Sequence, residues 1–293
     1  MQRSILAGPG AGEAPPAQAR PAATATPPIR LLGERRLGSG AGEATLQYRK
    51  GWALLAYLAL ERQRHPRARL AAMLWPRLGE TAALTNLRQV LSDLNRAMAS
   101  AIGDGVLQID RESVRLCPAR SPGLFDVDRL DACVAGNGPG EAQAWLAEAG
   151  ELLEGMTLDA CESFAEWLAG ARAWTAHRLA DGLAVLRDTA SARGARGEAL
   201  VLARRLVAQD PWNEVHYRAL MRLHAQAGEP GMALACYRSL VDRLKADLGE
   251  APSRETAELA EAIRTMVRHA PAAAWWSGRA RPPRRTLALA LGA

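Results

Sequence analysis

Cysteine and histidine are rare in this chain of 293 residues, and neither forms a recognisable metal-binding pattern. The four cysteines include no CxxC pair, and the five histidines show no HExxH or HxxxH spacing. Scattered cysteines of this kind are typical of reduced thiols, and they argue against a disulfide framework or a zinc site. We therefore expect a cytoplasmic protein that holds no metal and no other cofactor.

Long hydrophobic runs and the motifs of common enzymes are also missing. No window approaches 18 apolar residues, so we predict no membrane-spanning segment. The Gly- and Pro-rich N-terminus does not have the pattern of a signal peptide. The chain lacks Walker and Rossmann glycine patterns and a GxSxG motif, and the run GSGAG at 38–42 is interpreted as a loop. An enzyme is therefore the least favoured function class.

Aromatic residues are scarce, and charge is unevenly divided along the chain. With two phenylalanines and four tyrosines, the core must be built mostly from leucine and alanine, which favour helices. Residues 30–120 carry 15 basic and 8 acidic side chains, whereas residues 121–270 carry 16 basic and 22 acidic ones. We therefore predict a mainly α-helical protein in which a basic module binds a polyanion and is attached to an acidic body.

Residues 29–120 have the pattern of a winged-helix domain. Short apolar runs with glycines predict small strands at the start, and three helical patterns follow, at 49–63, 67–75 and 81–98. Two alternating runs, at 106–109 and 113–116, then predict a β-hairpin. In a winged helix the third helix carries an exposed reading face and the hairpin is the wing. Residues 1–28, rich in Ala and Pro, are expected to be disordered.

The segment TAALTNLRQVLSDLNRAM, residues 81–98, predicts a helix with two distinct faces. Apolar residues from Leu84 to Met98 fall on one side, as core packing requires. The opposite stripe has no carboxylate, with Asp93 to one side. We predict that four residues of this stripe read bases: Thr85, Arg88, Gln89 and Ser92. We predict that the fifth, Arg96, contacts a phosphate. The alternative is an ordinary solvated helix face, and the winged-helix layout favours DNA.

Basic residues begin the first two predicted helices, where they oppose the helix dipole. A phosphate bound at such a terminus reverses the unfavourable effect. We therefore predict phosphate contacts for Arg49, Lys50, Arg67 and Arg69. The alternative is that these side chains cover apolar surface. Arg111 lies in the hairpin turn, where we expect it to enter or flank the minor groove, the alternative being a solvated turn residue.

Residues 141–268 are helical throughout and contain an internal repeat. The segments 195–211 and 229–245 align at an offset of 34 residues, which is the period of the tetratricopeptide repeat. The matching positions are Ala199 with Ala233 and Leu206 with Leu240. Pro211 closes the first unit, but Lys245 replaces the proline of the second. We predict an all-α, TPR-like domain, with an unrelated helical bundle as the alternative.

Two segments fall outside these domains. Residues 121–140 have Pro and Gly at both ends and are predicted to be a junction between the two domains. Residues 269–293 form a basic, Pro-containing tail with no acidic side chain, and we expect this tail to be disordered.

Together these motifs resemble the SARP-type bacterial transcription activators. The runs IRLLGERRL, RKGWALLAYLALE, RLAAMLWP and NLRQVLSDLNRAM resemble their OmpR-like winged helix, and LLEGM, CESFAEWLAGARAW and residues 202–256 resemble the bacterial transcriptional activation domain that follows it. The resemblance implies an activator that binds double-stranded DNA at direct repeats, as a homodimer or side-by-side protomers, on the nucleoid and not at a membrane. It also implies contact with RNA polymerase through the loop between the second and third helices, here Pro76, Arg77, Leu78, Gly79 and Glu80.

Two features depart from this family. Asp93 and Asn95 stand in a part of the third helix that usually carries basic residues, and an acidic group beside a phosphate is repulsive. No segment of the length of a receiver domain precedes the winged helix, so we do not expect phosphorylation as a switch. The second function class is therefore an interaction adaptor, in which the helical repeats bind a protein and the winged helix has weak or no affinity for DNA.

Overall fold

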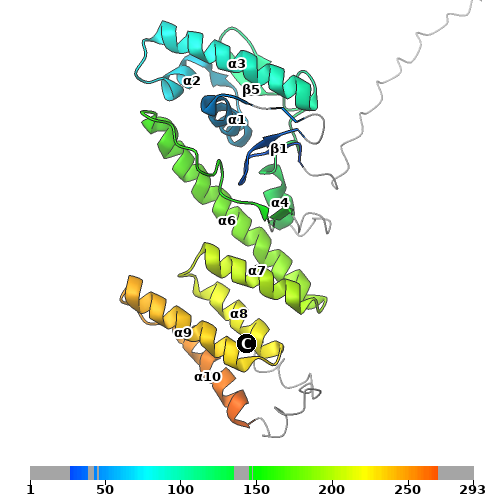
Figure 1. The fold of residues 1–293 in the computed structure, drawn as a ribbon, viewed down its shortest axis with the longest axis vertical. Coiled ribbons are helices and arrows are strands. Elements are labelled where there is room, and N and C mark those ends of the chain that lie inside the picture. Colours follow the sequence, from blue (N-terminus) through cyan, green and yellow to red (C-terminus); the bar gives the residue numbers. More distant parts are fainter. Residues whose placement is uncertain (1–26, 39–42, 45, 135–144, 147, 270–293) are drawn as a thin grey trace, which may run out of the picture.

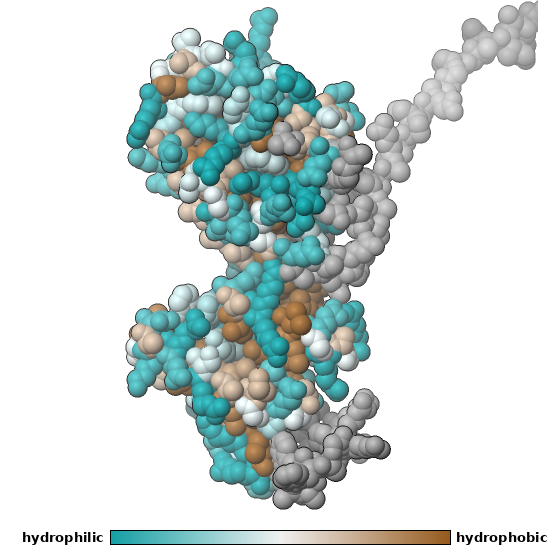
Figure 2. Space-filling model, viewed as in Figure 1, coloured by the Kyte–Doolittle hydropathy of each residue, from teal (hydrophilic) through white to brown (hydrophobic). Residues whose placement is uncertain are grey.

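The structure, a computed structural model, describes residues 27–38, 43–44, 46–134, 145–146 and 148–269. These residues form two lobes joined by one long helix that runs diagonally between them (Figure 1). Figure 2 shows that the molecular surface is drawn in between the two lobes. The predictions for residues 1–26, for the loop 39–42 and for the tail from residue 270 lie outside the described residues.

The first lobe contains the three helices predicted for a winged helix. They are α1 (Arg49–Glu61), α2 (Arg67–Leu74) and α3 (Glu80–Ile102). α1 is buried from Gly51 to Ala59, as its nearly continuous apolar sequence predicts. α3 extends beyond the predicted segment at both ends, and it stops where Gly103 takes a φ of 97°, a conformation that favours glycine.

Two small antiparallel sheets complete this lobe. β1 (Ile29–Arg30) pairs with β2 (Arg36–Leu37), and the second sheet has the order β3 (His65–Pro66), β5 (Ser113–Leu116), β4 (Leu107–Ile109). Ile109 pairs with Val114 and Leu107 with Leu116, so β4 and β5 form the predicted hairpin around residues 110–112. The prediction of a mainly α-helical chain with an N-terminal winged helix is therefore confirmed.

The second lobe is a stack of helices with the predicted repeat. Its members are α6 (Glu162–Ala192), α7 (Arg196–Gln209), α8 (Glu214–Gln226), α9 (Pro230–Asp247) and α10 (Arg254–His269). α7 and α9 begin at the positions that the 34-residue offset pairs, Arg196 and Pro230. Ala199, Ala233, Leu206 and Leu240, which the offset aligns, are all fully buried. α9 continues to Asp247 because Lys245, unlike Pro211, does not prevent the helix from continuing.

The predicted junction packs against the N-terminal strands. The carboxylate of Asp126 is fully buried and accepts the backbone N–H groups of Leu31 and Leu32 at 2.9–3.0 Å. α4 (Asp128–Val134) follows at once, and the rest of the junction, residues 135–140, lies outside the described residues. One continuous cluster of buried apolar side chains extends from Ile29 to Leu206. The winged helix and the start of the helical lobe thus share one core.

The first turns of α6 dock on the winged helix. The indole Nε1 of Trp167 donates to Glu61 Oε1 at 2.7 Å, and its ring meets the Tyr57 ring edge-on at 4.9 Å. The Sγ of Cys161, just before α6, donates to the Leu74 carbonyl at 3.3 Å. Packing therefore fixes the orientation of α6 against both α1 and α2.

Candidate nucleic-acid interface

The two faces of α3 differ in burial as the sequence predicts. Leu87, Leu91, Leu94 and Met98 are fully buried, and Leu84 is half-buried. The five residues of the polar stripe are all exposed: Thr85, Arg88, Gln89, Ser92 and Arg96. Because the apolar side is fixed in the core, these polar groups are held on one outward surface of a winged helix.

Arg88 is a residue of this stripe that is free to bind a ligand. Among the residues that the structure describes, it has no hydrogen bond and no ion pair, and its guanidinium keeps all its donors. Thr85, one turn earlier, donates its Oγ1 to the Thr81 carbonyl at 2.9 Å. That hydrogen bond fixes the Thr85 hydroxyl as an acceptor toward any further partner.

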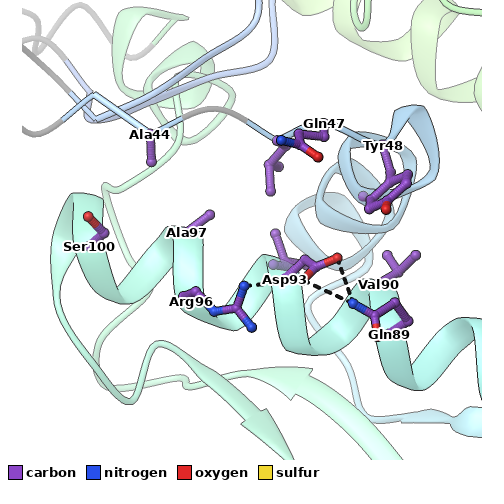
Figure 3. A pocket seen from close by; sticks show the side chains of 12 residues that line it. Ala44, Gln47, Tyr48, Gln89, Val90, Asp93, Arg96, Ala97 and Ser100 are labelled. Atoms are coloured by element: carbon purple, nitrogen blue, oxygen red, sulfur yellow. Dashed lines mark hydrogen bonds and ion pairs between the residues drawn. The ribbon is translucent and has the colours of Figure 1, made fainter.

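Asp93 connects two other members of the stripe. The Gln89 Nε2 donates to the Asp93 carboxylate at 3.2 and 3.3 Å, and Arg96 Nη1 lies 3.5 Å from Asp93 Oδ1 (Figure 3). The Asp93 side chain is 23% exposed. It lies in the wall of a pocket of about 420 Å³ between α3 and the chain that leads into α1, near Gln47 and Tyr48. Asp93 thus faces its helical neighbours more than solvent.

The basic residues at the starts of α1 and α2 have different surroundings. Arg49 and Arg69 are exposed, and neither makes a hydrogen bond or ion pair within the described part of the chain. The ammonium of Lys50 lies 4.6 Å from the centre of the Trp75 ring, a cation–π contact. Arg67 Nη1 donates to the Asp110 carbonyl at 3.2 Å and so binds the wing. Of these four predicted phosphate contacts at the starts of α1 and α2, two are therefore unengaged and two also hold the fold together.

The turn of the wing is organised by Asp110. Its carboxylate accepts the backbone N–H groups of Glu112 and Ser113 at 2.9 and 2.7 Å and the Ser113 hydroxyl at 2.8 Å. These hydrogen bonds, that of the Ser113 hydroxyl foremost, lower the pKa of Asp110. Arg64 Nη1 forms an ion pair with the same carboxylate at 2.9 Å. Arg111 is exposed at the tip of this ordered turn, beside the exposed Glu112.

Arg64 is a basic residue of this surface that the sequence interpretation missed. It lies outside the predicted helices and the hairpin. It belongs to the basic run RQRHPRAR, residues 62–69, which leads from the end of α1 into α2. The density of basic residues in that run was the available signal. Its position beside the wing depends on the pairing of β3 with β5, in which His65 faces Val114, and no local pattern shows that pairing.

Comparison with known proteins defines the acidic part of the chain. Residues 126–264 match the model of the bacterial transcriptional activator domain. The matched segment begins at Asp126, within the shared core, and it includes α4, α6 and the repeat helices as far as residue 264. No curated protein sequence matches the chain.

A solved structure extends the comparison to the winged helix. The structure of Mycobacterium tuberculosis EmbR in complex with a low-affinity phosphopeptide matches with a TM-score of 0.60 and 21% sequence identity, over 81% of this chain. The chain spans 65% of the length of that EmbR chain. The likeness shows the fold, a winged helix followed by the activator domain. Together with the match over residues 126–264, it agrees with the resemblance to the SARP-type activators.

The loop between α2 and α3, ahead of the activator domain, is fully on the surface. Residues 76–80 are all exposed, and the Leu78 side chain is 43% exposed although it is apolar. The backbone N–H of Leu78 donates to the Trp75 carbonyl at 3.1 Å, which turns the loop outward from α2. The loop therefore presents an apolar side chain on a short, defined turn.

The described residues contain neither a metal-binding cluster nor a membrane-spanning helix. No group of three or more His, Cys, Asp or Glu side chains lies close enough to hold a metal ion there. No described helix is both long and apolar enough to cross a membrane. The four cysteines are all free thiols.

Proposed function

We propose that this regulator is a sequence-specific, DNA-binding transcription activator that reads the major groove with α3. The observation that carries this proposal is the exposed stripe of α3, in which an unengaged Arg88 lies between Thr85 and Ser92 on a helix with its other face fixed in the core. An arginine in the major groove can donate two parallel hydrogen bonds to guanine O6 and N7. Thr85, Gln89 and Ser92 are the other proposed base contacts.

Phosphate binding is proposed for the basic residues around this helix. Arg49 and Arg69 are unengaged at two helix N-termini, where free backbone N–H groups add to the attraction for a phosphate. Lys50, Arg67 and Arg96 are proposed as further phosphate contacts, although each also has a partner within the protein. The net charge of +7 over residues 30–120 supports this orientation of the molecule on DNA.

The wing is proposed to contact the minor groove through Arg111. The turn that carries Arg111 is held by hydrogen bonds from the next two backbone N–H groups to Asp110, so little backbone ordering is needed on binding. Arg111→Ala should weaken DNA binding severalfold, most strongly on sites flanked by A·T-rich sequence, where a narrow minor groove attracts arginine. Fluorescence anisotropy with duplexes that differ only in their flanks measures this effect. Unchanged affinity on every duplex would rule out the wing contact.

We also propose that the loop 76–80 contacts RNA polymerase and that protomers bind side by side on direct repeats. The exposed Leu78 on an ordered turn supports the first proposal. Leu78→Asp should then abolish activation in a purified transcription assay while DNA binding remains at the wild-type level. Activation that persists in this variant would place the polymerase contact elsewhere.

The decisive experiment for DNA binding is an electrophoretic mobility shift with fragments of the promoter region of the protein's own gene. A complex that survives a large excess of random duplex supports sequence-specific binding. A complex that random duplex removes at equal concentration contradicts it. Residues 141–268, tested in the same assay, should leave all fragments free because they carry 15 basic and 19 acidic side chains, a net charge of −4.

A protein-interaction adaptor is the second candidate function, and the surface of the repeat lobe favours it. Several large apolar side chains are exposed there, among them Val201, Trp212, Val215, Met232 and Leu248. Exposed apolar side chains that form a patch mark interaction surfaces. The mobility-shift experiment separates the two candidates, because an adaptor without DNA affinity leaves every promoter fragment free.

A further inference from the structure

Asp93 is an acidic residue on a helix that we propose to lie against DNA, and its contacts give it a specific role there. It accepts from Gln89 one turn before it and pairs with Arg96 three residues after it. Both partners belong to the exposed stripe, and the dashed lines of Figure 3 join all three side chains. Asp93 therefore controls what two of the five residues of the stripe can present to a ligand.

The first consequence concerns the amide of Gln89. An ionised carboxylate only accepts hydrogen bonds, so the Nε2 end of the amide must face Asp93 and the Oε1 end is left for another partner. A free glutamine reads adenine with both ends, since it accepts from N6 and donates to N7. The amide nitrogen carries two N–H donors and is held against the Asp93 carboxylate, so Oε1 is the end of the amide that is turned away from Asp93. In the major groove, the groups that donate to a lone acceptor are the amino groups of adenine N6 and cytosine N4.

We propose that Asp93 is a specificity-determining residue, which orients Gln89 to read an exocyclic amino group, of adenine or cytosine, in the major groove. This inference rests on the proposed function, that α3 lies in that groove. Gln89 then discriminates against guanine and thymine, which present acceptors at the equivalent position, O6 and O4. It distinguishes adenine from cytosine much less strongly than a glutamine with both ends free.

The second consequence concerns charge. Arg96 is 76% exposed, but the charge of its guanidinium is partly compensated by Asp93. The carboxylate also repels phosphates on every sequence. Asp93 thus lowers affinity for all DNA while it restricts one position of the site to adenine or cytosine. A residue with these two effects raises the ratio of specific to non-specific binding, which is the quantity that matters in a genome full of competing sites.

The test is the selection of binding sites from a library of random duplexes with the full chain, followed by anisotropy titrations on single-base variants of the selected site. Wild-type protein should prefer adenine or cytosine at one position by about tenfold over guanine or thymine. Asp93→Ala should bind random duplex more tightly, and its preference at that position should narrow to adenine, because a free Gln89 binds adenine with both ends of its amide. The preferences at the other positions should stay as they are.

Two further variants separate the orientation of Gln89 from the charge of Asp93. Asp93→Asn removes the charge but keeps an oxygen that accepts from Gln89 Nε2, so it should gain affinity for random duplex and retain most of the preference. The double variant Asp93→Ala with Gln89→Glu has only acceptor oxygens at position 89 and the wild-type net charge. It should restore the preference for adenine or cytosine. Gln89→Ala should lose the preference whether or not Asp93 is present.

The outcomes distinguish this inference from the proposal on which it rests. If Asp93→Ala changes the affinity for every selected and random duplex by the same factor, Asp93 acts only through its charge and the inference is wrong, while α3 still reads the site. If the wild-type selection enriches no sequence, the proposed function itself fails, and the inference fails with it.

Discussion

The two lobes of the molecule differ in how their cores are built. The first lobe shares one continuous apolar cluster, from Ile29 to Leu206, with the first helices of the second. The C-terminal helices are held by three small clusters, in which alanines such as Ala199, Ala203 and Ala233 lie where helices cross. Small residues allow two helices to approach closely, but each contact buries little apolar surface area. The stability of each C-terminal helix therefore depends only on the helices next to it.

The C-terminal helices make up for part of this difference with polar contacts. The half-exposed Glu229 contacts the buried His224 at 2.8 Å, and Arg218 donates to Thr256 Oγ1 at 3.0 Å and pairs with Glu255 at 3.1 Å. In both ion pairs the glutamate, Glu229 or Glu255, is at least half exposed, and solvent weakens such a contact. We therefore expect the C-terminal repeats to unfold at a lower denaturant concentration than the lobe that carries the proposed DNA interface.

The largest expected effect tests this difference in core structure. Leu54 of α1 and Leu240 of α9 are both fully buried, and either Leu→Ala change should lower the free energy of unfolding by about 2–5 kcal/mol. Leu54→Ala should increase amide hydrogen exchange in both lobes, because Leu54 belongs to the shared cluster. Leu240→Ala should increase it only in α7 to α10. Equal increases in the winged helix for both variants would show that the lobes do not differ in this way.

A second prediction concerns pH and the shared core. Burial raises the pKa of Asp126 to about 6, although three backbone N–H groups oppose that shift. The unfolded value is about 3.9, so between about pH 4 and pH 6 the folded state holds a proton that the unfolded state has lost. Stability from this group should fall as pH rises through that window and then stay constant, a change of about 3 kcal/mol at most.

Urea unfolding across this pH range measures the effect, with Asp126→Asn as the reference. The amide does not titrate, so the variant should lack the part of the pH dependence that comes from Asp126. If the stability of wild type and variant changes with pH in parallel, Asp126 is ionised in the folded protein over this pH range. Asp128, with a pKa that burial also raises, is present in both proteins and cancels in the comparison.

A smaller effect is expected at the contact between α6 and the winged helix. Trp167→Phe keeps the ring packed against Tyr57 but removes the hydrogen bond to Glu61, so it should cost about 1–2 kcal/mol of stability. Trp174→Phe is the matched control, since Trp174 is on the same helix, is 46% exposed and makes no hydrogen bond within the described residues. Its stability should stay within about 0.5 kcal/mol of wild type. Equal losses in the two variants would mean that the Glu61 contact contributes nothing.

The sequence predicted much of the fold because local patterns determine it. The periodicity of residues 81–98 predicted the two faces of α3, and the 34-residue offset predicted that Ala199 and Ala233 occupy equivalent buried positions. The extra length of α9 also has a local cause, the replacement of the closing proline by Lys245. Helical spacing and proline act within a few residues, so they can be interpreted from one sequence.

The shared core and the contacts of the candidate interface depend on distant residues. Asp126 binds Leu31 and Leu32 across more than 90 positions of the chain, whereas the Pro and Gly residues at both ends of 121–140 predicted only a junction between the domains. Asp93 was identified on the sequence as a source of repulsion. Its contacts with Gln89 and Arg96 depend on the side-chain conformations of all three residues, which helical spacing permits but does not determine.

The central claim, that the exposed face of α3 reads bases while the surrounding basic residues hold phosphates, is tested most directly by comparing Arg88→Ala with Arg49→Ala. The measurement is the affinity for a selected site and for random duplex over a range of salt concentrations. Arg88→Ala should cost about 1–3 kcal/mol on the selected site and little on random duplex. Arg49→Ala should weaken both equally and lower the salt slope by about one unit. If Arg88→Ala instead weakens both duplexes by the same factor, Arg88 is only a phosphate contact and the exposed face of α3 does not read bases.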